Sequence, residues 1–363
     1  MVSIPDDKFA QMPTVASELR CAYATLLYGC NVEYFLGALV MGWSLKATDA
    51  STERLLLYTD DVPQPYLRTL EMYWSLKEVE YLHGAANMYK DYHRSRFKMV
   101  FTKLQALNCT DYAKLLMLDL DMLVRSSLEE LFQLRAPAAM KRASGREQPP
   151  HGGTFGCEDI WRNERDEMKS GINAGVMLLE PSSRIYGRMV SEIRDSQHPE
   201  HVGTHGPEQD YLSRFYCTFG RGRWTHLHPR FNYQLGLPAN YVSSAYRGID
   251  IYRDVVVAHY SGRRGKPWKV DPDMGVEEVR RLLEDDTIRE QWNRPTRRPM
   301  QSGERSNDGM DVHEEEGILS GAELTLMWEW VLALRNCAAE LREEAGVNIL
   351  AVCRAVISER GLE

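Results

Sequence analysis

The sequence predicts an α/β protein in which a mainly parallel sheet is flanked by helices and followed by a C-terminal helical appendage. Strand-like and helix-like apolar patterns alternate through the first half of the chain, which is typical of parallel strands joined by helices. The run Leu115–Leu118 is apolar without alternation and therefore predicts a strand covered on both faces. Residues 321–360 carry apolar residues at helical spacing and predict the appendage.

The first half of the chain is expected to hold strands and the helices that connect them. The expected elements are strands at 22–28, 54–62 and 77–82 and helices at 33–48 and 65–74. The strands are apolar runs bounded by turn residues, the first helix has apolar residues at helical spacing, and Pro65 suits the first turn of the second. A helix within 101–116 is expected to lead into the strand that contains Leu115–Leu118.

The second half begins with an irregular segment and then resumes regular structure. The expected elements are a strand at 172–182, a helix at 208–216, a strand at 254–260 and helices at 321–346 and 347–360. Residues 141–171 are rich in Gly, Pro and charge, so we expect a mobile lid over the site. Its Pro-Pro-His-Gly-Gly core is not expected to continue a helix or to pair in a sheet.

These patterns predict an α/β domain at 1–290, a polar linker at 291–317 and a C-terminal helical segment at 318–363. Five apolar residues are expected along one face of the long C-terminal helix: Leu324, Trp328, Val331, Leu332 and Leu334. This face would either pack onto the larger domain or serve as a homodimer or partner-docking surface. Every motif that carries chemistry precedes Val270, so the residues after Gly317 are not expected to be required for it.

Composition excludes several classes of protein. The chain has 363 residues, a formal charge of −8 and no basic stripe, which argues against binding to nucleic acid. No apolar stretch approaches the roughly 20 residues that a membrane helix needs, and the opening residues lack the features of a signal peptide. The 7 cysteines are scattered and fit reduced thiols. We therefore expect a cytoplasmic protein without a membrane span.

A candidate metal site follows the apolar run Leu115–Leu118. Asp119 and Asp121 are one residue apart, so in an extended chain their side chains point to the same side and can converge on one cation. His259 also ends an apolar strand and is expected at the same rim of the sheet. Two carboxylates and an imidazole suit Mn²⁺ or Mg²⁺. The alternatives are that the aspartates cap a helix or stay solvated, and that the histidine is structural.

Lys266 lies seven residues after His259 in the segment GRRGKPW. The glycines let the backbone approach a ligand closely, and an ammonium group there could hold a diphosphate. The alternative is a solvated lysine in a loop.

These motifs together resemble a known family. The order Asp-x-Asp, NAGV, EQD, FNYQ and HY…GKPW, over Cys21 to Lys269, is similar to glycosyltransferase family 8, the group that contains glycogenin and galactinol synthase. The resemblance implies a GT-A fold in residues 1–290, a UDP-sugar donor and Mn²⁺. It also implies transfer of glucose or galactose, with retention at the anomeric carbon, to the hydroxyl of a sugar, polyol or protein acceptor.

Matched by position, the resemblance implies a role for individual residues. The implied metal ligands are Asp119, Asp121 and His259. The implied donor-binding residues are Leu26, Tyr34, Lys103, Asn173, Gly262 and Lys266. Glu208 and Gln209 match an Asp-Gln pair beside the donor sugar, and with Asp210 they are the candidates for a covalent intermediate. Attack by the acceptor on the same face of the sugar is the other route to retention.

Three other functions stay open from the sequence. A self-glucosylating primer is a variant of the main interpretation, with Tyr241, Tyr246 and Tyr252 near the acceptor position. The motif DLDMLV also matches the opening motif of haloacid-dehalogenase-like phosphatases, although that motif normally opens its domain. The last is a non-catalytic UDP-binding protein that recruits partners.

Overall fold

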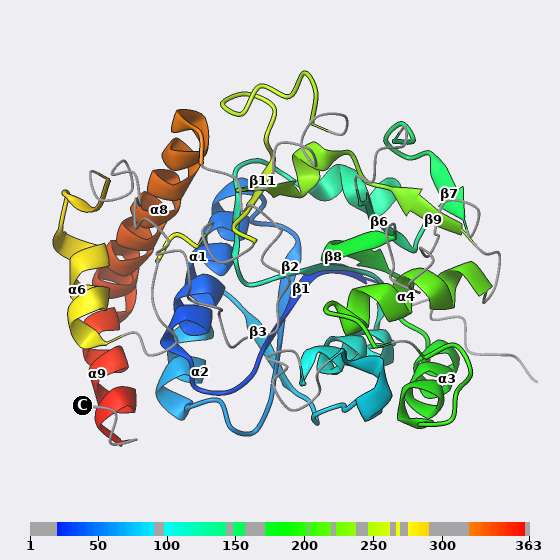
Figure 1. Cartoon of the computed structure of the whole chain (residues 1–363). Helices are drawn as coiled ribbons and strands as arrows, with labels where there is room; N and C mark the ends of the chain where they lie inside the picture. Colours follow the sequence, from blue (N-terminus) through cyan, green and yellow to red (C-terminus); the bar gives the residue numbers. More distant parts are fainter. Residues whose placement is uncertain are drawn as a thin grey trace, which may run out of the picture.

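The structure is a computed structural model that describes residues 20–90, 98–142, 148–156, 171–201, 203–218, 223–236, 246–261, 266–268, 275–289 and 319–359. The expected linker at 291–317, the Tyr241 position, Gly262 and most of the expected lid lie outside the described residues. A sheet lies at the centre of the molecule with helices on both sides, as expected for an α/β protein (Figure 1).

The central sheet has eight strands in the order β3-β2-β1-β4-β8-β6-β9-β7. Their bounds are β1 Arg20–Leu27, β2 Glu53–Tyr58, β3 Ser75–Glu78, β4 Tyr112–Leu118, β6 Ala138–Lys141, β7 Thr154–Gly156, β8 Ile172–Leu179 and β9 Arg223–His226. The strands β3, β2, β1 and β4 are parallel, as predicted. β8 is antiparallel to both β4 and β6, because the chain begins β8 near the end of β4: the Asp119 N–H donates to the Gly175 carbonyl at 2.9 Å.

Helices cover both faces of this sheet. The helices with described bounds in this part of the chain are α1 Val32–Thr48, α2 Gln64–Leu70, α3 Ser183–Arg194, α4 Pro207–Thr218, α6 Val276–Glu284 and the 3₁₀ helices η1 Ala86–Met88, η2 Val100–Asn108, η3 Glu129–Gln133 and η5 Pro229–Phe231. Leu116 and Leu118 of β4 belong to the hydrophobic cluster around α1, whereas Leu115 and Met117 belong to the cluster on the opposite face. The prediction of a strand covered on both faces is therefore confirmed.

A second, three-stranded sheet contains β10 Tyr233–Gln234, β11 Val257–His259 and β5 Met122–Val124. β11 is antiparallel to β5, and His259 is opposite Met122 in the pairing. His259 therefore reaches Asp121 through this small sheet and not, as expected, as a neighbouring end of the main sheet. The Tyr260 N–H donates to the Asp121 carbonyl at 2.8 Å, which fixes the backbone of one aspartate to the strand of the histidine.

The C-terminal helices α8 Gly321–Ala345 and α9 Ile349–Glu359 pack onto the α/β domain, with α8 alongside α1 (Figure 1). The buried residues of α8 are Leu326, Met327, Trp330, Val331, Ala333, Leu334, Cys337 and Leu341. The predicted face was partly wrong, because Leu332 is 41% exposed and Trp330 is fully buried. The helix begins in a capping box formed by Ser320 and Glu323, and it ends at Gly346 with φ +65°.

Part of the expected lid is a strand. β7 pairs with β9. The Gly152 N–H donates to the His226 carbonyl at 2.9 Å, and the His226 N–H donates to the Gly153 carbonyl at 2.7 Å. The Pro-Pro-His-Gly-Gly core itself lies in neither a helix nor a strand, as predicted, and the strand begins directly after it at Thr154. Among the described helices, none is both long and apolar enough to cross a membrane.

Candidate functional site

Asp119 and Asp121 lie in the turn between β4 and β5. Leu120, between them, is held against α1 at Gly37, where an added Cβ would lie 2.5 Å from the Leu120 carbonyl oxygen. Glycine is therefore needed there for this close contact between helix and turn. The close packing directs both aspartates away from α1 and toward β11.

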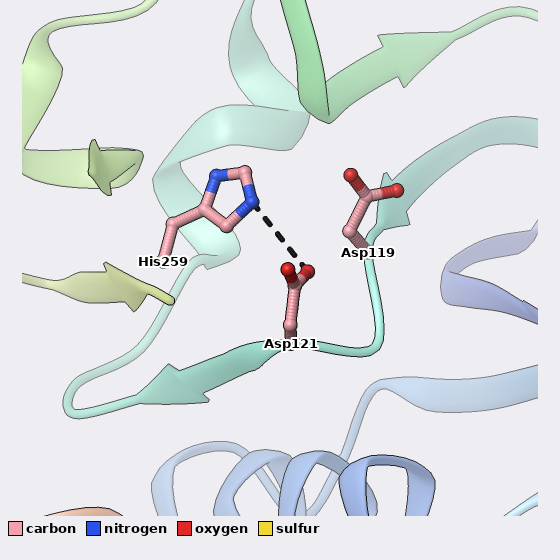
Figure 2. A group of neighbouring side chains, drawn as sticks. All are labelled: Asp119, Asp121 and His259. Atoms are coloured by element: carbon pink, nitrogen blue, oxygen red, sulfur yellow. Dashed lines mark ion pairs between the residues drawn. The ribbon is translucent and has the colours of Figure 1, made fainter. Parts of the chain in front are cut away.

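The two aspartates and His259 form the candidate metal centre. Figure 2 shows the imidazole and both carboxylates gathered at one place, from β11 and from the turn after β4. One ligand atom from each residue lies within 4.8 Å of the others. His259 Nε2 is 3.5 Å from Asp121 Oδ1. Two carboxylate oxygens and an imidazole nitrogen fit a divalent ion such as Mn²⁺ or Mg²⁺.

Lysines neutralise the carboxylates of this site. Lys103 Nζ from η2 lies 2.6 Å from Asp119 Oδ1 and 3.8 Å from Glu208 Oε1, and Lys266 Nζ pairs with Asp121. Burial tends to raise the pKa of Asp121, but the charges of Lys266 and His259 outweigh it and hold that pKa well below its usual value. Asp121 is therefore ionised and ready to bind a cation.

Glu208 lies in the first turn of α4 and is 4% exposed. Burial raises the pKa of its carboxyl group to about 7; nearby Lys103 opposes this rise, and Asp119 and Asp210 add to it. Asp210, also a predicted catalytic residue, instead forms an ion pair of 2.5 Å with Arg142. Of these two carboxylates, Glu208 is the one placed beside the Lys103–Asp119 pair.

The other predicted residues that the structure describes lie on several different elements. Leu26 is buried in β1, and Tyr34 is in the first turn of α1 with 36% of its surface exposed. Asn173 is in β8, where its side chain bonds within the protein. Gln209 is on α4, with its amide close to Gly206. Lys266 reaches the metal centre, as described above.

Sequence reasoning missed an aromatic cluster next to Tyr34. Tyr28 lies 6.1 Å from Tyr34 and 6.1 Å from Tyr81, measured between ring centroids. Asp61 accepts hydrogen bonds from the Gly29 N–H at 3.1 Å and the Tyr81 hydroxyl at 2.9 Å. Aromatic rings and a carboxylate at the ends of β1 and β2 suit a nucleobase. The expected strands at 22–28 and 54–62 included Tyr28 and Asp61, whereas β1 ends at Leu27 and β2 ends at Tyr58, so both residues follow their strands.

A second group of possible ligands, Glu192, His198 and Glu200, has a different explanation. Arg214 pairs with both of these carboxylates. Because the guanidinium group already neutralises them and would repel a cation, we interpret this group as a structural ion-pair network.

The fold and the site define an α/β protein with a candidate metal centre near the carboxyl ends of its strands, where ligands bind in open α/β sheets. The family model for "Glycosyl transferase family 8" matches residues 25–271, and the chain belongs to this family. The fold is therefore of the GT-A type, and the protein is a glycosyltransferase by family, as the sequence motifs predicted.

Curated relatives differ in how much of their length the chain matches. It is 34% identical over 260 residues to "Uncharacterized protein R707" of Acanthamoeba polyphaga mimivirus, covering 71% of this chain and 86% of that protein. It is 23% identical to galactinol synthase 1 of Solanum lycopersicum, covering 75% and 82%. It is 27% identical to inositol phosphorylceramide glucuronosyltransferase 1 of Arabidopsis thaliana, covering 56% of this chain but only 32% of that protein.

Among solved structures, the chain is similar to the galactosyltransferase LgtC in complex with donor and acceptor sugar analogs. The sequences are 21% identical, the match covers 69% of this chain and 90% of that one, and the TM-score is 0.44. The glycosyltransferase GlyE of Streptococcus pneumoniae TIGR4 matches with 16% identity, a TM-score of 0.48 and coverage of 94% of this chain and 64% of that one. Family membership does not favour the phosphatase alternative.

Proposed function

We propose that the protein is a metal-dependent retaining glycosyltransferase that transfers glucose or galactose from a UDP-sugar to a hydroxyl acceptor. The observation that carries the proposal is the convergence of Asp119, Asp121 and His259 with Lys266 at their edge. Carboxylate and imidazole ligands leave coordination positions for diphosphate oxygens. The proposed cofactor is Mn²⁺, with Mg²⁺ as the alternative.

The chemistry of the proposed reaction is governed by charge. When a UDP leaving group departs, negative charge grows on its β-phosphate, and a bound divalent cation would stabilise that charge. Asp119, Asp121 and His259 would hold the cation. With Asp121 holding the cation, the Lys266 ammonium group, which pairs with that carboxylate, would be free to pair with the diphosphate instead.

The donor sugar is proposed to lie between the metal centre and α4. Glu208 is the carboxylate on that side, since Asp210 is already paired with Arg142. With a pKa of about 7, Glu208 can be neutral or ionised near physiological pH, so it can donate or accept a hydrogen bond to a sugar hydroxyl. Leu26, Tyr34 and the Tyr28 ring are proposed to bind the uridine, and Gly262 and Lys266 the diphosphate.

We further propose a cytoplasmic location, where thiols stay reduced. The described cysteines are all free: Cys21, Cys30, Cys109, Cys217, Cys337 and Cys353. The acceptor is proposed to be a sugar, polyol or protein hydroxyl.

The test is release of UDP from UDP-glucose and UDP-galactose in Mn²⁺ without acceptor, followed by a panel of acceptors. We expect slow release for the parent, faster release with a matching acceptor, and a loss of at least about a hundredfold for Asp121→Asn, because a ligand of the metal is removed. The control is Asp195→Asn, which changes an exposed aspartate at the end of α3. Binding of UDP without release from either sugar would identify a non-catalytic protein instead.

A further inference from the structure

We propose that Asn173 and Asn232 form a relay that fixes the tautomer and the orientation of His259, so that its Nε2 lone pair faces Asp119 and Asp121. This inference rests on the proposed function, because it concerns how the protein prepares a metal ligand. The resemblance assigned Asn173 to the donor and gave Asn232 no role.

The relay starts at the backbone N–H of Gly175, a group that can only donate a hydrogen bond. The Gly175 N–H donates to Asn173 Oδ1 at 3.0 Å, and both residues belong to β8. A backbone N–H can only donate, so the atom of the Asn173 amide that faces it must be the oxygen. Gly175 is itself fixed, because its carbonyl accepts from the Asp119 N–H at 2.9 Å.

The orientation of the Asn173 amide in turn fixes the orientation of the Asn232 amide. Asn232 Nδ2 donates to Asn173 Oδ1 at 2.8 Å, because an amide oxygen can only accept. The other end of the Asn232 amide is therefore its oxygen, and this oxygen lies 2.7 Å from His259 Nδ1. Since a carbonyl oxygen needs a donor, Nδ1 must carry a proton. In the neutral imidazole the lone pair is then on Nε2, the atom that faces Asp121.

Burial makes it costly for the relay residues to lose a hydrogen bond to one another. Asn232 is 0%, His259 4% and Asn173 9% exposed, so these polar groups have little access to water. The opposite tautomer would place the Nδ1 lone pair against the Asn232 carbonyl oxygen and lose a buried hydrogen bond that water cannot replace. That is enough to make one tautomer dominant.

Packing fixes the plane of the same ring. A Cβ on Gly175 would lie 2.5 Å from His259 Cε1, so the imidazole lies directly against the backbone of β8. The relay sets which nitrogen carries the proton, and Gly175 sets where the ring lies. Asn232 is thus a positioning residue that acts through His259.

The first test reads the tautomer in the metal-free protein by long-range ¹H–¹⁵N correlation of labelled histidines at about pH 8.5, which is about two units above the ordinary pKa of free imidazole side chains. His259 should show a proton on Nδ1, and its signal is assigned by its loss in His259→Gln. His226 is an internal reference for the opposite tautomer, because its Nδ1 accepts from the Lys141 N–H at 3.1 Å. A proton on Nε2 of His259 in the parent would overturn the proposal without any variant of Asn232.

The second test changes the relay. Asn232→Leu has nearly the same size but no acceptor, so the Nδ1–H tautomer should lose its preference; Asn232→Asp keeps an acceptor and should restore it. In calorimetric titrations with UDP, Asn232→Leu should weaken binding in Mn²⁺ by about tenfold or more and leave binding in EDTA unchanged. Gln105→Leu is the control for the loss of a buried amide, because Gln105 bonds to the Glu80 carbonyl and to Tyr186.

The outcomes separate the inference from the proposed function. If the parent shows Nδ1–H but no Mn²⁺-dependent binding of UDP, the relay stands and the proposed function fails. If the parent binds UDP through Mn²⁺, and Asn232→Leu keeps both the tautomer and the affinity, the relay is wrong.

Discussion

At Glu208 burial and nearby charges act together on one carboxyl group, and its raised pKa gives a prediction about stability. Its folded pKa of about 7 is above the ordinary value of 4.5, so the folded state binds this proton more tightly than the unfolded state. The folded state therefore loses stability relative to the unfolded state as pH rises from 4.5 to 7.

We expect Glu208→Gln to be more stable than the parent at pH 8, by up to about 3 kcal/mol, and to gain little at pH 4.5. The glutamine keeps the shape of the side chain but carries no charge to bury. Urea unfolding at both pH values measures the difference. The control is Glu78→Gln, which changes an exposed glutamate. Glu329 is less suitable as a control, because it is only partly exposed and pairs with Arg125. A gain that is equal at both pH values would contradict the assigned cause.

Single residues were predictable where their role depends on local pattern. Asp119, Asp121 and His259 each end an apolar run, and that pattern is visible in the sequence. Asn232 was not predictable as a positioning residue, because its partners Asn173 and His259 are distant in the chain. Asp210 was grouped with Glu208, but residues two apart on a helix point in different directions, and Asp210 meets Arg142.

At the scale of the elements, α8 contacts the parts of the chain that carry the site. The Tyr260 hydroxyl, next to His259, donates to the Leu326 carbonyl at 2.7 Å, and Arg125, just after β5, pairs with Glu329 at 2.8 Å. The rings of Trp268 and Trp330 are 5.2 Å apart. The sequence predicted the helix but only part of its buried face, because the position of α1 decides which side is covered.

The packing of α8 gives a prediction about stability, while the expectation that the residues after Gly317 are not required for the chemistry stays a prediction. We expect Trp330→Ala to lower the free energy of unfolding by about 3–5 kcal/mol, because a fully buried ring is removed from the core. Trp328→Ala, on the same helix but only partly buried, should cost less. Chemical denaturation of both variants measures this, and equal, small losses would show that α8 packs only loosely on the domain.

His226 ties β9 to β6 and gives a second pH prediction. Burial lowers the pKa of this imidazole from 6.5 to about 3, so the unfolded state binds the proton more tightly. The stability contributed by neutral His226 is present above pH 6.5 and is lost progressively as pH falls toward 3.

Between pH 6.5 and 5 this loss amounts to about 2 kcal/mol. His226→Asn keeps an acceptor for the Lys141 N–H but cannot titrate, so its stability should fall less steeply over that range. Unfolding free energies of parent and variant at several pH values decide the matter. Parallel pH profiles would assign the acid sensitivity to other groups.

For the whole molecule, the α/β class could be predicted from alternating patterns, but the direction of β8 could not. Strand direction depends on where the chain enters the sheet, and the apolar pattern of β8 is the same in either direction.

We propose that residues 1–290 form the GT-A domain and that residues 318–363 are joined to it by a linker at 291–317. The hydrophobic core shared by α1 and α8 supports a single folding unit.

The central claim is that Asp119, Asp121 and His259 bind one cation that holds the diphosphate of UDP. Calorimetric titration of UDP into the parent and His259→Ala, in Mn²⁺ and in EDTA, tests it most directly. We predict that the variant loses tenfold or more in affinity in Mn²⁺, about 1.4 kcal/mol or above, because one ligand of the bridging ion is missing, and that both proteins bind equally in EDTA. Equal Mn²⁺-dependent affinity for the parent and His259→Ala would contradict the claim.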